Sequence, residues 1–256
     1  MRSCVFLGPT LPAAEVGRYL SEVEILPPVQ AGSVRTALHD GFRQIGIIDG
    51  YFEQVPTVWH KEILFALSEG ACVYGSSSMG ALRAAELHTL GMIGVGAIFE
   101  AYRDGELEDE DEVAVVHAPA EQGFAELSTA MANLRFGLGR ARTQRVIPPE
   151  VEARLLTLAK GWYYAERSWK ALLHEATRRE LASPTELSGL ATWVEQTRPN
   201  QKRDDACQLL LRMAQDRQSG VPASAVSFVF ETTEPWLQAE RAFMAQRRGS
   251  AARTAR

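Results

Sequence analysis

The stretch ACVYGSSSMGALRAAEL (residues 71–87) joins an apolar run, a turn of small residues and a helix-forming run. Residues 71–74 are rich in β-forming side chains, and residues 79–90 have a helical pattern. A strand that passes directly into a helix is typical of parallel sheets, because parallel strands need a crossover connection. The stretch therefore predicts an α/β fold with the serines at the carboxyl end of a strand.

The N-terminal part of the chain repeats this alternation. Strands are predicted over 4–7, 23–26, 45–49, 71–74 and 112–119, and helices over 12–20, 33–39, 56–69, 79–90 and 97–103. The pattern predicts a mostly parallel sheet with helices on both faces, a three-layer arrangement of Rossmann or flavodoxin type. Sheets of this kind bind ligands at the carboxyl ends of their strands.

The sequence pattern changes near residue 121, because the segments after it show helical periodicity and few strand patterns. Residues 121–142 can form one long helix or two, and further helices are expected to open at Pro149, Pro184 and Gln201. We expect three parts, an α/β core domain over 1–120, a helical region over 121–246 and a disordered basic tail over 247–256.

Composition excludes several classes of function. The 256 residues carry a net charge of -5, which gives no electrostatic reason to expect nucleic acid as a partner. No apolar run approaches the roughly 18 residues of a membrane span, and the N-terminal apolar stretch is too short for a signal peptide, so a cytoplasmic protein without a membrane partner is expected. The three cysteines form no CxxC pair, and neither a metal nor a cofactor is expected.

An acidic stretch, DGELEDEDE (residues 104–112), contains seven carboxylates. We interpret it as a solvated loop between a helix and the strand expected at 112–119. The alternative is a surface that binds a basic partner.

The serine turn has the spacing of a nucleophile elbow. Ser78 has a small residue two positions away on each side, Ser76 and Gly80, and the new helix begins at the next residue. Small neighbours are needed because such a strand-to-helix turn is crowded. The amide of Met79 would then face a developing oxyanion, and Ser77 would be a filler or a further amide donor. Two other interpretations stay open, since Ser78 could simply cap the helix, and a phosphate could bind at the helix N-terminus although no GK[ST] motif is present.

Three further groups are predicted near the same edge of the sheet. Asp49 ends one expected strand, His117 ends another, and His60 lies about one turn into the helix that Pro56 opens. Either histidine is a candidate base, with Asp49 orienting it, although each could equally be a partly buried histidine without a chemical role.

Arg83 and Glu86 fall three residues apart on the helix that follows the serines, so they share a face. They could form an ordinary surface ion pair. Alternatively, Arg83 could reach an anionic group held over the serine turn.

The sequence resembles the TfuA-like family over about residues 4–136. The resemblance is carried by VFLGPTL (5–11), IDGYFEQVPTVWHKEIL (48–64), GSSSMGALRAAEL (75–87), GMIGVGAIFEAYRDGELEDEDEVAVVHAP (91–119) and AELSTAMANLR (125–135), which occur in the family's order. The family's serine motif maps onto Gly75, Ser78, Met79, Gly80, Arg83 and Glu86, and a second motif maps onto Asp49 and His60.

The resemblance implies an accessory protein for peptide or protein thioamidation, with two partners. One is a YcaO-type ATP-dependent cyclodehydratase or thioamide synthetase, and the other is a ubiquitin-like sulfur-carrier protein that ends in a thiocarboxylate. On this hypothesis the protein is a thiocarboxylate hydrolase, in which Ser78 attacks the thiocarboxylate carbon and Arg83 stabilises the anion. His60 or His117 acts as the base, and His60 is favoured because it lies in the stronger family motif. The rival hypothesis is a non-catalytic partner that recruits the sulfur source or activates YcaO, and a third is an anion-binding module.

Overall fold

The computed structural model describes residues 1–53, 55–220, 226 and 228–254, with side chains described up to residue 245. Its centre is a five-stranded, all-parallel sheet in the order β2-β1-β3-β4-β5. The strands are β1 (Arg2–Phe6), β2 (Val23–Leu26), β3 (Phe42–Ile47), β4 (Cys72–Gly75) and β5 (Ile93–Gly94). This strand order is the flavodoxin-like doubly wound order, so the predicted fold class is confirmed.

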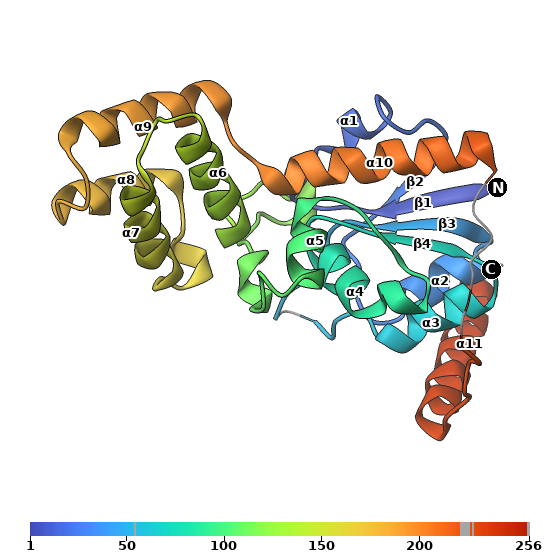
Figure 1. Ribbon diagram of the computed structural model, residues 1–256. Coiled ribbons are helices and arrows are strands. Elements are labelled where there is room, and N and C mark those ends of the chain that lie inside the picture. Colours follow the sequence, from blue (N-terminus) through green and yellow to red (C-terminus); the bar gives the residue numbers. More distant parts are fainter. Residues whose placement is uncertain (54, 221–225, 227, 255–256) are drawn as a thin grey trace.

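Helices cover both faces of the sheet, as Figure 1 shows. One face carries α2 (Ser33–His39), α3 (His60–Ser68), α4 (Met79–Leu87) and α5 (Ala97–Arg103), and the other carries α1 (Ala13–Val16) and α10 (Gln201–Ser219). The helix predicted from Pro56 begins only at His60, because the backbone of Trp59 is extended, with φ -77° and ψ 137°. The structure therefore delivers the three-layer arrangement that the alternating pattern predicts.

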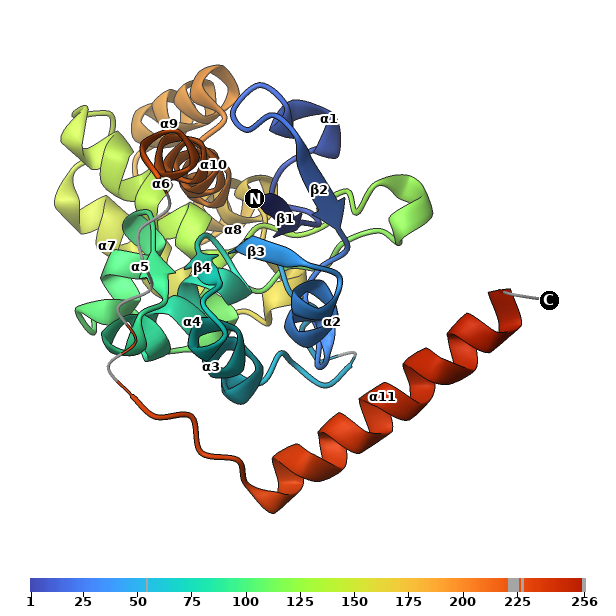
Figure 2. The ribbon, with the colours of Figure 1, turned by 90° about the vertical axis from the view of Figure 1, so that its right-hand side faces the viewer.

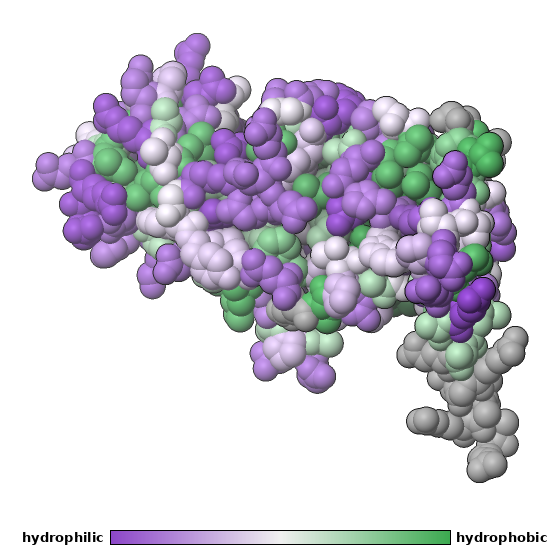
Figure 3. Space-filling model, turned by 90° about the horizontal axis from the view of Figure 1, so that it is seen from below, coloured by the Kyte–Doolittle hydropathy of each residue, from purple (hydrophilic) through white to green (hydrophobic). Residues whose placement is uncertain are grey.

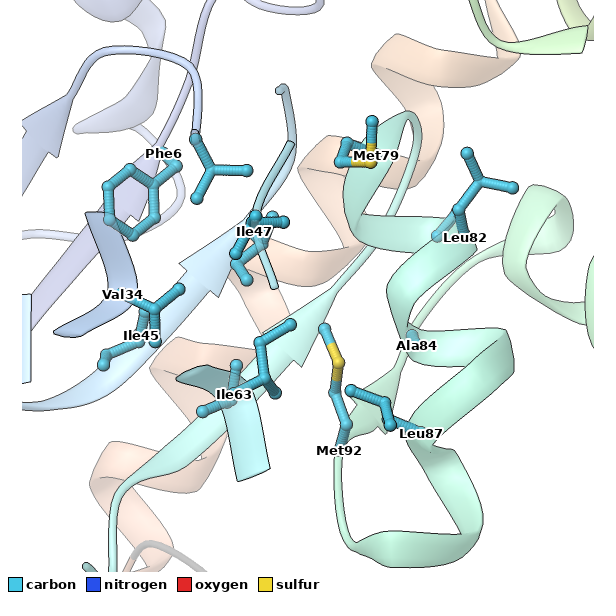
Figure 4. Close-up of a cluster of buried hydrophobic side chains, with 14 of the residues drawn as sticks. Phe6, Val34, Ile45, Ile47, Ile63, Met79, Leu82, Ala84, Leu87 and Met92 are labelled. Carbon is cyan, nitrogen blue, oxygen red and sulfur yellow. The ribbon is translucent and has the colours of Figure 1, made fainter. Parts of the chain in front are cut away.

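The core between the sheet and α2 to α4 is apolar and continuous. Ile45 and Ile47 project from β3 toward Ile63 of α3 and Met79 of α4, all fully or almost fully buried. Figure 4 shows these side chains gathered with Met92, which follows α4. Burial of this apolar surface, at about 25 cal/mol per Å², is the main force that holds the helices on the sheet.

The opposite face of the sheet is covered by a helix from the far end of the chain. Leu209 and Met213 of α10 pack against Val5 and Tyr74. Gly46 permits this contact, because a Cβ at that position would lie 2.8 Å from the sulfur of Met213. The helical region thus contributes a layer of the α/β core, which the sequence gives no reason to expect.

One predicted strand was wrong, and one strand of the sheet was not predicted. The segment 112–119 forms no strand of the sheet; its only ladder contact among the described residues is an isolated antiparallel bridge between His117 and Glu126. Its apolar side chains Val113 and Ala114 are buried, so the run reflects burial rather than strand pairing. The fifth strand is instead β5, which has only two residues and gives no strand pattern.

The helical lobe has a core of its own. The lobe consists of α6 (Met131–Thr143), α7 (Pro149–Lys160), α8 (Trp169–Arg178) and α9 (Pro184–Thr197). Short 3-10 helices occur along the chain at His88–Leu90, Glu110–Glu112, Ala120–Gln122 and Tyr164–Glu166. Helix α9 opens with a capping box in which Ser183 and Glu186 satisfy each other's backbone amides. The segment 121–142, expected to form one long helix or two, forms an α-helix only from Met131 onward, and the helix that begins at Pro149 ends at Lys160.

Helix α11 (Glu234–Thr254) extends away from the rest of the molecule in Figure 2. Its Trp236 and Phe243 contact α2, where the guanidinium of Arg35 lies 4.3 Å from the centre of the Phe243 ring. Residues 247–254, expected as a disordered tail, continue this helix, and residues 255–256 lie outside the described part. The division at residues 120 and 246 stays a prediction.

The acidic stretch 104–112 is only partly solvated. Asp111 pairs with the buried Arg167 at 2.6 Å, and Glu112, almost fully buried, pairs with Arg135 at 2.8 Å and with Lys160 at 3.0 Å. These ion pairs fasten the end of the stretch to the helical lobe. Its carboxylates at this end are therefore neutralised by the chain itself.

Candidate functional site

The candidate site lies where the order of strands reverses, between β1 and β3. Asp49 follows β3 and is almost fully buried. One of its carboxylate oxygens accepts hydrogen bonds from the amides of Gly8 (2.9 Å) and Thr10 (3.1 Å), and the other accepts from the Thr10 hydroxyl at 2.6 Å. Asp49 therefore holds the loop after β1 in place. Ligands of doubly wound sheets bind at such a switch point.

The serine turn brings β4 and α4 into very close contact. A Cβ on Gly75 would lie 2.1 Å from the carbonyl oxygen of Gly80, and a Cβ on Gly80 would lie 1.8 Å from the carbonyl oxygen of Ile47. Only glycine fits at either position. The amide of Ser76 also donates to the Ile47 carbonyl at 3.1 Å, so the turn is anchored to the neighbouring strand.

The three serines are not equivalent. Ser76 and Ser77 are completely buried, and the hydroxyl of Ser77 donates to the carbonyl oxygen of Lys202 at 2.8 Å. Ser77 has a φ of 66°, in the left-handed region. Ser78 has φ -121° and ψ -123°, outside the main allowed regions, which marks local strain in the turn.

Ser78 does not cap α4 with its side chain. Its hydroxyl has no hydrogen-bond partner within the part of the chain that the structure describes, and the residue is 8% exposed. The capping interpretation is therefore wrong, and the hydroxyl of Ser78 is free to meet a ligand.

The amide of Met79 begins α4 and has no acceptor among the described residues, whereas the next amide, that of Gly80, donates to Ile48 at 3.4 Å. Such a free amide at a helix N-terminus is suited to an oxyanion. The Met79 side chain itself is buried in the core.

A small cavity of about 50 Å³ opens beside Ser78. It is lined by Pro9, Asp49, Gly50, Phe52, Ser78, Val113, Ala114, Val115, Val116, His117 and Tyr164. Three predicted site residues, Asp49, Ser78 and His117, thus line one cavity. Although 112–119 is not a strand, the segment crosses the carboxyl edge of the sheet and forms one wall.

His117 is held in a defined tautomer. Its Nδ1 lies 2.8 Å from the carbonyl oxygen of Ala118, and a carbonyl can only accept, so Nδ1 carries the proton. In the neutral ring, Nε2 is then an acceptor. The ring is flanked by Tyr51 at 6.3 Å and Phe124 at 5.6 Å between ring centres. The neutral ring therefore presents Nε2 as its proton acceptor, which is the atom that a general base uses.

His60 occupies another place. Its Nε2 lies 2.7 Å from Glu86, and Arg83 donates to the same carboxylate oxygen at 2.7 Å and to the carbonyl of Val58 at 3.3 Å. Burial raises the pKa of Glu86, but the hydrogen bonds from His60 and Arg83 outweigh it and hold that pKa below its usual value. None of these three side chains lines the cavity beside Ser78. Arg83 and Glu86 form the expected ion pair, but the Arg83 side chain is buried, so the pair does not lie on the surface as expected.

Two ionisable residues that the sequence did not single out contact the cavity wall, Lys202 through Val113 and Glu126 through a backbone bridge with His117. Lys202, at the start of α10, is fully buried, and its Nζ donates to the carbonyl of Val113 at 3.1 Å. Glu126 has a buried carboxylate oxygen without a partner. Burial raises the pKa of Glu126, with Lys202 opposing and Asp49 adding to the rise. No sequence signal marks Lys202, because it stands in the charged run QKRDD, which reads as solvent-exposed.

The fold and the site together define a doubly wound α/β protein with a small cavity at its switch point, and the lining of this cavity includes a serine, an aspartate and a histidine. Residues 49–168 match the model of the TfuA-like protein family, so the resemblance is confirmed over the segment that contains Asp49, Ser78 and His117. This match supports an accessory role alongside YcaO proteins in general terms. No curated protein matches the chain.

Among the described residues, no helix combines the length and the hydropathy that crossing a bilayer requires. The underside of the molecule in Figure 3 is a mosaic of hydrophilic and hydrophobic residues.

Proposed function

We propose that this protein releases sulfide for YcaO-dependent thioamidation by hydrolysing a thiocarboxylated, ubiquitin-like sulfur carrier, with Ser78 as the nucleophile. One observation carries the proposal, namely that the unpartnered hydroxyl of Ser78 lines the same cavity as His117. The strained backbone of Ser78 and the free amide of Met79 support it. Each feature is one that acyl transfer to a serine needs.

In the proposed reaction, the Ser78 oxygen attacks the thiocarboxylate carbon while its proton passes to Nε2 of His117. The amide of Met79 stabilises the oxyanion, His117 passes the proton on to the sulfur, the carbon–sulfur bond breaks, and hydrosulfide leaves, so that His117 is neutral again. Hydrosulfide is a good leaving group because its conjugate acid is much stronger than an alcohol. Water, deprotonated by His117, then cleaves the acyl–serine ester. The sum is thiocarboxylate plus water giving carboxylate plus hydrogen sulfide, with no redox change and no cofactor.

His117 is the better supported base of the two predicted histidines. It lines the cavity, and its Nδ1 donates to the Ala118 carbonyl so that Nε2 is the acceptor of the neutral ring, whereas His60 is engaged with Glu86. Asp49 supports the loop after β1 rather than a histidine, since its oxygens accept from Gly8 and Thr10. In this site the carboxylate shapes the cavity and does not complete a triad.

One observation favours the rival function. No hydrogen bond joins Ser78 to an imidazole in the described part of the chain, so the proton relay is not assembled in the free protein. A non-catalytic partner that recruits the sulfur source or activates YcaO would need no relay. Apo geometry is often loose, and substrate binding would have to bring the two groups together.

The isolated protein distinguishes the two functions. Incubated with a short synthetic peptide that ends in glycine thiocarboxylate, a hydrolase releases sulfide without YcaO, whereas a recruiting partner releases none above background. A second assay supplies free sulfide to YcaO and its peptide. Under the proposed function, free sulfide replaces this protein; a continued requirement for it would favour allosteric activation.

A further inference from the structure

The most unusual charge in the protein is the ammonium of Lys202. The residue is fully buried, yet its Nζ has a single acceptor among the described residues, the carbonyl oxygen of Val113. An ammonium has three donors, so two remain without an acceptor in the described structure. A buried, unneutralised charge is costly, so the ammonium is suited to a negative group that arrives with a ligand.

The carboxylates around the cavity do not neutralise Lys202. No ion pair within 4.0 Å joins Lys202 to any described carboxylate. Asp49 accepts from the amides of Gly8 and Thr10 and from the Thr10 hydroxyl, which are neutral donors, and it forms no ion pair with Lys202 within 4.0 Å. Glu126 is close enough to interact electrostatically with Lys202, but burial raises its pKa and so favours its neutral form. The ammonium of Lys202 thus has no direct carboxylate partner among the described residues, although it lies next to the cavity wall.

The cavity has no other cation. Its lining contains neither lysine nor arginine, and Arg83, the residue that the sequence suggested for holding an anion, is bound to Glu86 outside the lining. Lys202 does not line the cavity itself, but its Nζ donates a hydrogen bond to the carbonyl of Val113, and Val113 forms part of the cavity wall. The N-terminus of α4, at Met79, adds a partial positive charge at the same edge.

We propose that Lys202 is the buried counter-charge that draws a carboxylate-type chain end, a thiocarboxylate or its carboxylate product, into the cavity beside Ser78. It acts as a positioning residue, through the wall that Val113 forms. This inference rests on the proposed function for the identity of the substrate. On this inference Lys202, and not Arg83 as the sequence suggested, is the residue that attracts the anion.

The size of the cavity restricts the chain end. The cavity volume of about 50 Å³ is little more than the roughly 30 Å³ that one water molecule occupies in the liquid. A terminal glycine has no side chain to place there, whereas a larger last residue would need space in a cavity that Phe52 and Tyr164 help to line. The expected ligand is therefore a flexible chain end that finishes in glycine.

Binding of unreactive peptides tests this inference without requiring hydrolysis. A fluorescent pentapeptide ending in glycine is prepared with a free carboxylate and with a neutral carboxamide, and the Kd of each is measured by anisotropy. The full-length wild type is expected to bind the carboxylate at least about tenfold more tightly, as one good charge interaction provides. In Lys202→Met and in Lys202→Gln the ratio of the two Kd values should fall close to one, while the exposed Lys170→Met should keep the wild-type ratio.

The ratio is measured within one variant, so a loss of overall stability does not change it. Lys202→Gln retains an N–H for the Val113 carbonyl and provides a second variant if the methionine does not fold. Two results would overturn the inference, namely a wild type that does not prefer the carboxylate and uncharged variants that keep the preference. A protein that shows the preference but releases no sulfide would uphold this inference and contradict the hydrolase function.

Discussion

The hydroxyl of Ser77 donates a hydrogen bond of 2.8 Å to the backbone carbonyl of Lys202, 125 residues further along the chain. The amide of the same lysine donates to the side chain of Asn133 at 2.9 Å. The turn that presents Ser78 is therefore held both by the strand before it and by the start of α10. Its geometry depends on the helical region as much as on the sheet.

Substitutions at Ser77 should separate this hydrogen bond from backbone strain. Ser77→Ala loses the bond to Lys202, at a cost of about 1 kcal/mol, and keeps a side chain at φ 66°. Ser77→Gly loses the same bond but relieves the strain, so it should be more stable than the alanine variant by up to about 1 kcal/mol. Urea unfolding of the two variants measures the difference. An alanine variant more stable than the glycine variant would contradict the strain at this residue.

Close packing of the turn should make Gly80 intolerant of any side chain. Gly80→Ala would place a Cβ 1.8 Å from the carbonyl oxygen of Ile47, a backbone atom that cannot move aside, so a loss above about 3 kcal/mol is expected. Gly189→Ala, in the middle of α9 with no atom within 4 Å of the new Cβ, is the matched control. It should raise stability by roughly 0.5–1 kcal/mol. Thermal unfolding of both variants gives the comparison.

The two histidines should differ sharply in their effect on sulfide release. Removing a general base typically lowers the reaction rate by about 10²- to 10⁴-fold, and we expect His117→Ala to lower the rate of sulfide release by about that factor. His60→Ala removes only a half-exposed ion pair with Glu86 and should lower the rate of sulfide release by less than about tenfold. The initial rate of sulfide release, measured for both variants, decides between them. The opposite order of effects would identify His60 as the base.

Asp205 should make the stability depend on pH. The residue is fully buried, and burial raises its pKa to about 6, although the amides of Ala97 and Ile98 donate to it. Between pH 4 and 6 the folded state then binds more protons than the unfolded state, so the free energy of unfolding falls as the pH rises through this window. A shift of roughly two pH units corresponds to about 3 kcal/mol. Urea titrations across this window should show the decline in the wild type, and Asp205→Asn should lack it.

Local patterns predict most of the sheet. The limits of β2 are those predicted, and β1, β3 and β4 differ from their predicted limits by one to three residues. The failures have physical causes. The apolar run at 112–119 is buried without ladder partners, and the two residues of β5 are too few for any period to appear.

The candidate site could be predicted only in part. Asp49 and Ser78 follow directly from the rule that strand ends meet at one edge, and His117 reaches the cavity although its strand does not exist. Lys202 could not be found this way. Its burial results from tertiary contacts across the whole chain, and a lysine in a charged run gives no local sign of them.

The most direct test of the account is the rate at which Ser78→Ala releases sulfide from a peptide that ends in glycine thiocarboxylate. Ser76→Ala is the control, because Ser76 is buried two residues earlier and does not line the cavity. The account predicts that Ser78→Ala loses at least about 10³-fold in rate while Ser76→Ala stays folded and active. Release by Ser78→Ala at the wild-type rate would contradict it.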